Sequence, residues 1–265
     1  MLFKQLIFAS MASASCMHGL EMFKRADVAQ WGFGPLNGPF NWASLAPANA
    51  VCKSGKNQSP INIDSTIGAA PSRPVLDVRD GAVEFENLGT TIEVVVNGTT
   101  RYNNADYQLV QFHMHTPSEH HINSEYYPLE VHFVHQRVSD NTQLAVIAFM
   151  FELSTGKSDP VISGLSSTVP KIATPGSHET IAKGLDFSGI YSKLKTSQIL
   201  TYRGSLTTPP CAEGVTFLIV KDALPISVPD FNAIKKVVKF NSRFLQNKLG
   251  EPNMLDIAAR AGVAA

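Results

Sequence analysis

The chain has 265 residues, 44% of them hydrophobic, and its 22 basic and 22 acidic side chains give a formal net charge of zero. This length and apolar content suit a single domain with a sizeable core. Nothing in this charge balance suggests a nucleic acid or an acidic membrane surface as partner, because both bind basic patches. No stretch approaches the roughly 20 apolar residues of a membrane span. We therefore expect neither a nucleic-acid partner nor a membrane anchor.

The N-terminal residues have the pattern of a secretory signal peptide. Lys4 precedes an apolar run over residues 6–12, and small residues follow. We expect residues 1–18 to be the signal peptide, followed by a short pro-segment that ends at Arg25. The alternative is an ordinary buried helix. Residues 26–265 then form the domain, which we expect to be secreted.

The cysteines fit the same compartment. Cys16 falls in or beside the signal peptide, which leaves Cys52 and Cys211 in the mature chain. An even number of cysteines in an oxidising compartment predicts one disulfide between them. The alternative is a pair of buried thiols.

The first part of the mature chain is expected to be irregular. Residues 20–57 hold short apolar pieces between Gly, Pro and Asn residues, with Trp31 and Trp42 anchoring them by burial. Strands are expected at residues 83–85 and 91–96.

The dipeptide Asn97-Gly98 predicts a hairpin turn before a further strand at residues 99–102, because a type I′ turn needs positive φ at both central residues. Asn97 also begins an Asn-Gly-Thr acceptor for glycosylation, and a hairpin tip is exposed. We therefore expect a glycan at Asn97.

The second half of the chain mixes strands and helices. In chain order the sequence predicts a strand at residues 144–153, helices near 160–169 and 177–184, a strand at 215–220, and a helix at 229–240 with Ser227 as its cap and Pro229 in its first turn. Strands outnumber helices, so we expect one α+β domain.

Polar side chains concentrate in two further strands, within residues 111–135. Gln111, His113 and His115 alternate with apolar residues, so they share one face of a strand. On the second strand His132 lies on the same face as Glu130, and it meets the first two histidines if the strands are neighbours. Three neutral histidines with one open position are the ligand set of a catalytic zinc site.

The neighbours of the histidines strengthen the prediction of a metal site. Ligating histidines usually donate their second ring N–H to an outer acceptor, and Gln111 and Glu130 can accept it. A lone histidine on a strand is more often a core or surface residue, and that is the role we expect for the remaining histidines of the mature chain, which are His120, His121, His135 and His178.

The motifs of this sequence resemble those of the α-class carbonic anhydrases. The matching motifs are QFHMH (111–115), SEHH (118–121), LEVHFVH (129–135), WGFGPLNGPFNW (31–42), QSPINI (58–63) and RGSLTTPPCAEGVTF (203–217), which together span roughly residues 29–250. The resemblance implies a large, mostly antiparallel twisted β-sheet with short peripheral helices. It also implies Zn²⁺ as cofactor and the reversible hydration of CO2 to bicarbonate and a proton, by attack of zinc-bound hydroxide.

The resemblance also implies roles for individual residues. Thr207 would orient the hydroxide while its own hydroxyl donates a hydrogen bond to the Glu119 carboxylate. The backbone carbonyl of Asn241 would hold His115. The apolar CO2 pocket would be formed by Val134, Val146, Leu206, Thr208, Val215 and Phe217, the last of which replaces the family's usual tryptophan.

The sequence departs from the family pattern near the expected path of the proton. Thr90 stands where the fast members have a proton-shuttling histidine, and Phe33, Leu88 and Glu93 replace other polar residues. We therefore expect slow proton release, although the zinc chemistry itself is unaffected.

Two other functions fit parts of the pattern. The spacing of His113, His115 and Glu119 also matches a cupin metalloenzyme, in which the acid is a ligand, but the flanking cupin motifs are missing. A non-catalytic binding module on the same fold is the second alternative. Such relatives characteristically lose zinc histidines, and all three are present here.

Overall fold

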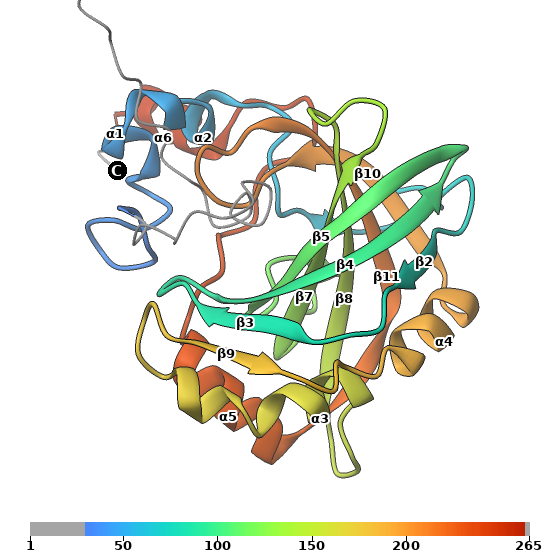
Figure 1. The fold of residues 1–265 in the computed structure, drawn as a ribbon. Coiled ribbons are helices and arrows are strands. Elements are labelled where there is room, and N and C mark those ends of the chain that lie inside the picture. Colours follow the sequence, from blue (N-terminus) through green and yellow to red (C-terminus); the bar gives the residue numbers. More distant parts are fainter. Residues whose placement is uncertain (1–29, 263–265) are drawn as a thin grey trace, which may run out of the picture.

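A nine-stranded twisted β-sheet forms the centre of the protein (Figure 1). The computed structural model describes residues 30–262. The strands of this sheet are β2 (Val75–Val78), β3 (Val83–Asn87), β4 (Ile92–Tyr102), β5 (Ala105–His115), β7 (Leu129–Arg137), β8 (Leu144–Ser154), β9 (His178–Ile181), β10 (Ile199–Ser205) and β11 (Glu213–Ser227). Their order is β10-β11-β8-β7-β5-β4-β3-β9, with β2 also paired to β4.

The pairing is antiparallel throughout this sheet, except that β11 runs parallel to β8. A separate parallel pair joins β1 (Asn62–Ile63) to β6 (His121–Ile122). The expected α+β fold with a mostly antiparallel sheet is therefore confirmed.

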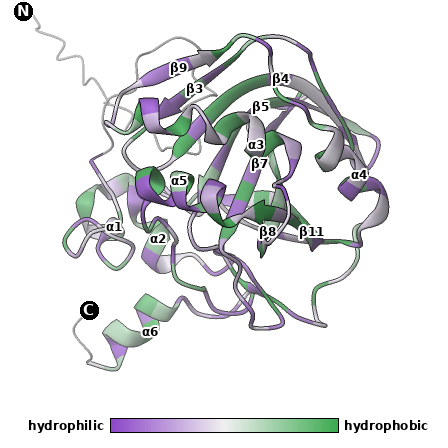
Figure 2. Ribbon diagram, turned by 90° about the horizontal axis from the view of Figure 1, so that it is seen from below, coloured by the Kyte–Doolittle hydropathy of each residue, from purple (hydrophilic) through white to green (hydrophobic). Residues whose placement is uncertain are grey.

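Alternation along the strands gives the sheet two different apolar faces. On β7, Val131 and Phe133 belong to the larger apolar cluster, whereas Val134 belongs to a smaller one on the other face. Figure 2 shows hydrophobic segments running along central strands such as β4 and β8. Since His132 alternates with Val131 and Phe133, it lies on the face with the smaller cluster.

One set of helices covers the larger apolar cluster, and a second set lies at the opposite end of the molecule. They are α1 (Trp42–Leu45), α2 (Val51–Ser54), α3 (Pro160–Ser166), α4 (Ser188–Thr196), α5 (Val228–Val238) and α6 (Met254–Arg260), with 3-10 turns at Pro47–Asn49 and Val169–Ile172. Buried side chains of α3, α4 and α5 join the larger cluster, while α1, α2 and α6 gather at the other end of the molecule (Figure 1). As expected, α5 begins with Ser227 as its cap, and the Ser227 hydroxyl accepts from the Asp230 N–H at 3.3 Å.

The prediction of a helix at residues 177–184 is wrong. Residues 178–181 form the edge strand β9, which pairs with β3 from Val83↔Ile181 to Glu86↔His178. The backbone groups along the open side of β3 need partners, and this tertiary demand outweighs local helix preference. No helix was predicted at Ser188–Thr196, which forms α4.

The hairpin predicted at Asn97-Gly98 is also wrong. Both residues lie inside β4, at a point where its register with β5 shifts between Val95 and Gly98. A Cβ on Gly98 would come within 2.5 Å of the Asp77 carbonyl oxygen, so the glycine is required by the close approach of β2. The real turn between β4 and β5 is Asn103-Asn104, with φ of 48° and 59°.

The segment before the sheet is anchored as expected. Trp31 and Trp42 are buried in one cluster with Cys52 and Cys211, which form a disulfide with a Cα–Cα distance of 5.1 Å. This disulfide ties α2 to the loop between β10 and β11. The expected signal peptide and pro-segment, residues 1–25, lie outside the described residues.

Candidate functional site

Three histidines meet on the face of the sheet that carries the smaller apolar cluster. Antiparallel pairing of β5 and β7 places His113 directly opposite His132, and His115 follows two residues later on the same face. Their ring centroids lie 4.7–5.4 Å apart. Each side chain offers a ligand atom within 4.8 Å of the other two, and all three residues are no more than 2% exposed. The strands therefore form a group that can hold one metal ion.

Each ring is fixed by a hydrogen bond through its second nitrogen. His113 Nδ1 lies 2.9 Å from Gln111 Oε1, His115 Nδ1 lies 3.0 Å from the Asn241 carbonyl oxygen, and His132 Nε2 lies 2.6 Å from Glu130 Oε1. The ring nitrogens that could bind a metal are therefore Nε2 of His113, Nε2 of His115 and Nδ1 of His132. In the described part of the chain, His115 Nε2 is buried and has no hydrogen-bond partner, as expected of a ligand atom.

The electrostatics keep two of these histidines neutral. Burial lowers the pKa of His113 well below its usual value, and the neighbouring His115 and His132 lower it further. Burial also lowers the pKa of His115, although Glu119 opposes the shift. A histidine must be neutral to bind a metal, so both rings are ready for ligation near neutral pH.

His132 is tuned by its carboxylate partner. Burial lowers the pKa of His132, but the charge of Glu130 and the hydrogen bond to it outweigh burial, so this pKa ends above its usual value. Burial opposes ionisation of Glu130, yet His120 and His132 together hold the pKa of Glu130 well below its usual value. Glu130 is therefore ionised, and it favours a positive centre on the far side of the His132 ring.

His120 has a role in the site that the sequence analysis missed. Its Nδ1 lies 2.7 Å from Glu130 Oε1, and the backbone N–H groups of Glu119 and His120 both donate to Glu130 Oε2 at 2.8 Å. On its other side His120 Nε2 lies 2.6 Å from the Tyr202 hydroxyl. His120 thus holds the carboxylate that holds His132. Its position next to Glu119 in SEHH is the signal that could have indicated this role.

Thr207 and Glu119 border the histidines, and each has an atom without a partner. Thr207 Oγ1 and Glu119 Oε2 are buried and make no hydrogen bond in the described residues, so the bond expected between them is not formed here. Glu119 Oε2 lies 3.4 Å from His115 Nε2 and 4.0 Å from His132 Nδ1, while Glu119 Oε1 accepts from the Arg243 N–H at 3.0 Å. Unsatisfied atoms of this kind mark a place where a ligand belongs.

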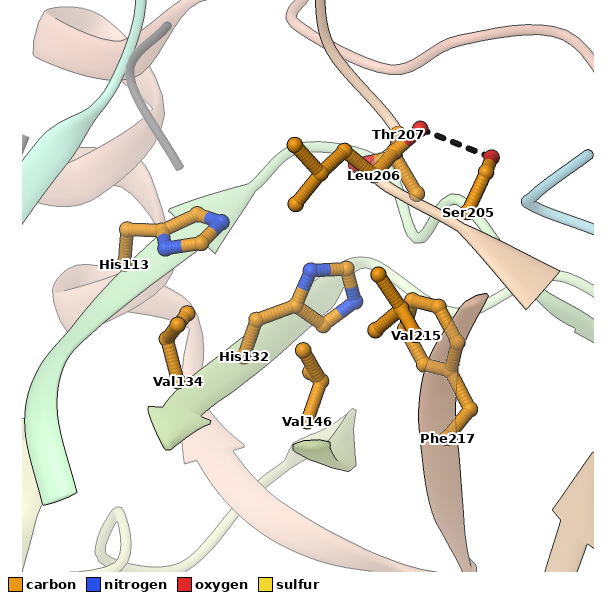
Figure 3. A pocket seen from close by; sticks show the side chains of 9 residues that line it. All are labelled: His113, His132, Val134, Val146, Ser205, Leu206, Thr207, Val215 and Phe217. Atoms are coloured by element: carbon orange, nitrogen blue, oxygen red, sulfur yellow. Dashed lines mark hydrogen bonds between the residues drawn. The ribbon is translucent and has the colours of Figure 1, made fainter. Parts of the chain in front are cut away.

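A small apolar pocket opens in front of two of the histidines (Figure 3). Five of the six residues expected to surround CO2 line it, and Thr208 does not. The lining residues are His113, His132, Val134, Val146, Ser205, Leu206, Thr207, Val215 and Phe217. Phe217 also stacks on Tyr202, with ring centroids 5.1 Å apart. The pocket therefore presents an apolar wall to the metal group.

Two of the residues that depart from the family pattern, Glu93 and Thr90, lie close to the site. Glu93 on β4 is buried and pairs directly with His113, which places it on the metal-binding face. Thr90 precedes β4, is buried, and its carbonyl oxygen accepts from Asn241 Nδ2 at 3.0 Å. The Thr90 hydroxyl is not a proton acceptor with a pKa near 7.

Known proteins resemble this chain over most of its length. A family model described as eukaryotic-type carbonic anhydrase matches residues 37–254. A carbonic anhydrase of Pectobacterium atrosepticum is 32% identical over 226 residues, which cover 83% of this chain and 88% of that protein. The structure of a fungal α-carbonic anhydrase from Aspergillus oryzae is 40% identical, covers 87% of this chain and 98% of its own, and superposes with a TM-score of 0.82.

A second solved structure shows the same fold. The α-carbonic anhydrase of Thermovibrio ammonificans, in complex with the inhibitor sulfanilamide, is 31% identical. It covers 84% of this chain and 98% of its own chain, with a TM-score of 0.75. With its three-histidine group, its apolar pocket and these matches, the chain belongs to the α-class, or eukaryotic-type, carbonic anhydrase family, whose reaction is the hydration of CO2.

Proposed function

We propose that the chain hydrates CO2 at a single zinc ion bound by His113, His115 and His132. The observation that carries this proposal is the convergence of three buried imidazoles, each fixed through its second nitrogen by Gln111, the Asn241 carbonyl or Glu130. Three neutral nitrogen ligands leave a fourth tetrahedral position open, which is the arrangement of catalytic zinc sites. When bound, zinc lowers the pKa of a coordinated water to about 7, which supplies hydroxide at neutral pH.

The chain itself orients the reactants. We assign to Glu119 the acceptance of a hydrogen bond from Thr207, because each has a buried unsatisfied oxygen beside the histidines. A threonine hydroxyl that donates its only proton can then act solely as an acceptor. Thr207 therefore accepts a hydrogen bond from the attacking hydroxyl group and turns a lone pair of that group toward the pocket.

The pocket suits the substrate. CO2 is apolar and bicarbonate is charged, so an apolar wall holds the substrate without stabilising the product. The proposed wall consists of Val134, Val146, Leu206, Val215 and Phe217. Thr208 is buried but does not line the pocket, and we propose that it lies beside the substrate without forming part of the apolar wall.

The family matches favour zinc chemistry over a cupin-type site. A cupin would need Glu119 as a metal ligand, whereas one oxygen of this carboxylate already accepts from the Arg243 N–H. The intact histidine set likewise argues against a non-catalytic binding module.

We also propose that the protein is secreted. The disulfide Cys52–Cys211 supports an oxidising compartment, and residues 1–18 have the composition of a signal peptide, with a pro-segment to residue 25 and the domain over residues 26–265. Asn97 is exposed on β4 and is the proposed glycosylation site. No helix in the described region is long and apolar enough to cross a membrane.

The decisive experiment measures zinc content and CO2 hydration on the same preparation. We expect one zinc per chain, rapid hydration, and inhibition by sulfanilamide, which inhibits the T. ammonificans enzyme. His132→Ala should lose both zinc and activity, whereas His121→Ala, a change at a half-buried histidine outside the group, should keep both. Full zinc and full rate in His132→Ala would refute the assignment.

A further inference from the structure

The segment of residues 239–243 follows α5 and is hydrogen-bonded to the end of β5, where the candidate ligand His115 lies. Thr116, the residue after His115, makes contacts with it in both directions. The Thr116 hydroxyl donates to the Lys239 carbonyl, the Asn241 N–H donates to the Thr116 carbonyl at 3.2 Å, and the Thr116 N–H donates to Asn241 Oδ1 at 2.7 Å. Asn241 and Arg243 are both buried.

This segment supplies two main-chain groups to the site. The Asn241 carbonyl oxygen holds His115 Nδ1 at 3.0 Å, and the Arg243 N–H holds Glu119 Oε1 at 3.0 Å. Every residue carries a carbonyl and every residue except proline an N–H, so these two contacts do not by themselves require asparagine or arginine. The identity of each side chain must be explained by what it does to the position of its own backbone.

The Asn241 side chain fixes the carbonyl that holds His115. Its Nδ2 donates to the Met114 carbonyl at 2.8 Å and to the Thr90 carbonyl at 3.0 Å, and its Oδ1 accepts from the Thr116 N–H. Two of these partners flank His115 in the chain. The amide therefore locks the backbone on both sides of one metal ligand to the residue whose carbonyl orients that ligand.

The Arg243 side chain fixes the N–H that holds Glu119, through a different set of partners. Its Nη1 donates to Gln58 Oε1 at 3.0 Å and to the Ser59 carbonyl at 2.8 Å, and its Nη2 donates to the Cys52 carbonyl at 3.0 Å. These partners lie in the N-terminal segment and share none with Asn241. A displacement of the Arg243 backbone would therefore move Glu119, and a displacement of the Asn241 backbone would move His115.

We propose that the 239–243 segment aligns the zinc ligand His115 and the carboxylate of Glu119 independently, with Asn241 and Arg243 as positioning residues that act through their own main chain. This proposal rests on the proposed zinc-dependent function. It assigns metal retention to Asn241 and orientation of the nucleophile, through Glu119, to Arg243.

The test compares three variants of the zinc-loaded protein in two readouts, the rate of zinc release to a chelator and kcat/KM for CO2. Asn241→Ala should release zinc about 10- to 100-fold faster, the usual effect of losing an outer partner of a ligand. Arg243→Lys should keep the wild-type release rate but lower kcat/KM about tenfold or more, because small displacements of an orienting group are costly. Asn253→Ala is the matched control for zinc release, since buried Asn253 also makes three hydrogen bonds to backbone groups but none to residues 114–116.

The outcomes separate the proposal from its foundation. The segment is merely structural, and the inference is overturned, if Asn241→Ala releases zinc no faster than Asn253→Ala. The same holds if, in every variant, zinc release rises and kcat/KM falls in proportion to the loss of Tm. Should Arg243→Lys fail to fold, Gln58→Met removes one acceptor of the same guanidinium group and carries the same expectation. A wild-type chain that binds no zinc or hydrates no CO2 would instead overturn the proposed function.

Discussion

His115 Nε2 and Glu119 Oε2 lie 3.4 Å apart, and both atoms are buried without a hydrogen-bond partner in the described chain. They are four residues apart, yet they come from different kinds of structure, since His115 ends β5 and Glu119 lies in the loop beyond it. This short distance places the proposed partner of Thr207 beside a candidate metal ligand. A change at Thr207 should therefore affect the reaction rate.

Thr207→Val should keep zinc but lower CO2 hydration by about 10²-fold, the scale for losing one preorganised hydrogen bond at an active site. Valine has nearly the shape of threonine and removes only the hydroxyl. Stopped-flow hydration rates and metal analysis of the same sample check this expectation. An unchanged rate would remove Thr207 from the mechanism.

A double-mutant cycle tests whether Thr207 acts through Glu119. Glu119→Gln alone should also lower kcat/KM, because the amide can donate a hydrogen bond to Thr207 and so reverse the direction of their contact. If the two residues form one unit, the double variant should be no worse than the poorer single variant. Effects that simply multiply would show that the two residues act separately.

The disulfide should contribute strongly to stability. Cys52 and Cys211 are 159 residues apart, and the chain-entropy model gives roughly 4–5 kcal/mol for closing a loop of this size. Replacing both cysteines with serine should lower the free energy of unfolding in urea by about that amount. A loss of less than about 1 kcal/mol would show that the unfolded chain is not constrained in this way.

His135 should make the protein sensitive to acid. Burial lowers the pKa of His135 to about 4, although hydrogen bonds to the Phe133 and Ala145 carbonyls oppose the shift. The folded state therefore binds this proton later than the unfolded state, whose histidine has a pKa near 6.5. The stabilising contribution is complete above pH 6.5 and is lost as the pH falls toward 4, with a slope of about 1.4 kcal/mol per pH unit.

The measurement is the free energy of unfolding at several pH values for the wild type and for His135→Gln. Other buried histidines titrate in both proteins, so the difference in slope isolates His135. We expect the variant to have the shallower slope between pH 6.5 and 4. Parallel curves would mean that His135 does not bind a proton on unfolding in this window.

Turnover should be limited by proton release. Thr90 is expected at the shuttle position, and buried Glu93 is the nearby acid on the face of the sheet that carries the histidines. We expect kcat in weak buffer to fall well below the roughly 10⁶ s⁻¹ of fast carbonic anhydrases, and to rise with the concentration of small buffers. The ratio kcat/KM should suffer less, because it reports attack on CO2.

Thr90→His should raise kcat in weak buffer, while Ser167→His, at an exposed position just after α3, should not. If the native enzyme already runs at the fast rate without buffer and Thr90→His changes nothing, then another proton path exists.

The sequence was sufficient to predict that the three histidines come together. It was insufficient to predict the backbone contacts that hold the surrounding residues in place. Alternation alone places His113 and His115 on one face, and the direct pairing with His132 needs only that two strands are neighbours. The contribution of Arg243 to Glu119 comes from a backbone N–H, which has no signature in residue type. Such contacts depend on tertiary placement, and no local pattern encodes them.

The errors in secondary structure have the same origin. Gly98 signals a turn by its local chemistry, yet its small size serves the approach of a distant strand. His178–Ile181 becomes a strand because the edge of β3 is available to it. Local sequence signals predicted structure correctly where local hydrogen bonds determine it, as at the Ser227 cap of α5.

The direct pairing of His113 with His132 also determines which insertions and deletions the gene can tolerate. The part of the connection between β5 and β7 that follows His120 can change in length, because the strand pairing fixes the three histidines and this part holds no residue of the proposed site. A single codon added or removed within β7, between the loop and His132, is different. It would turn His132 toward the apolar cluster that holds Val131 and Phe133, and the metal site would be lost while the sheet still formed. We therefore expect length variation among natural relatives to fall outside these two strands.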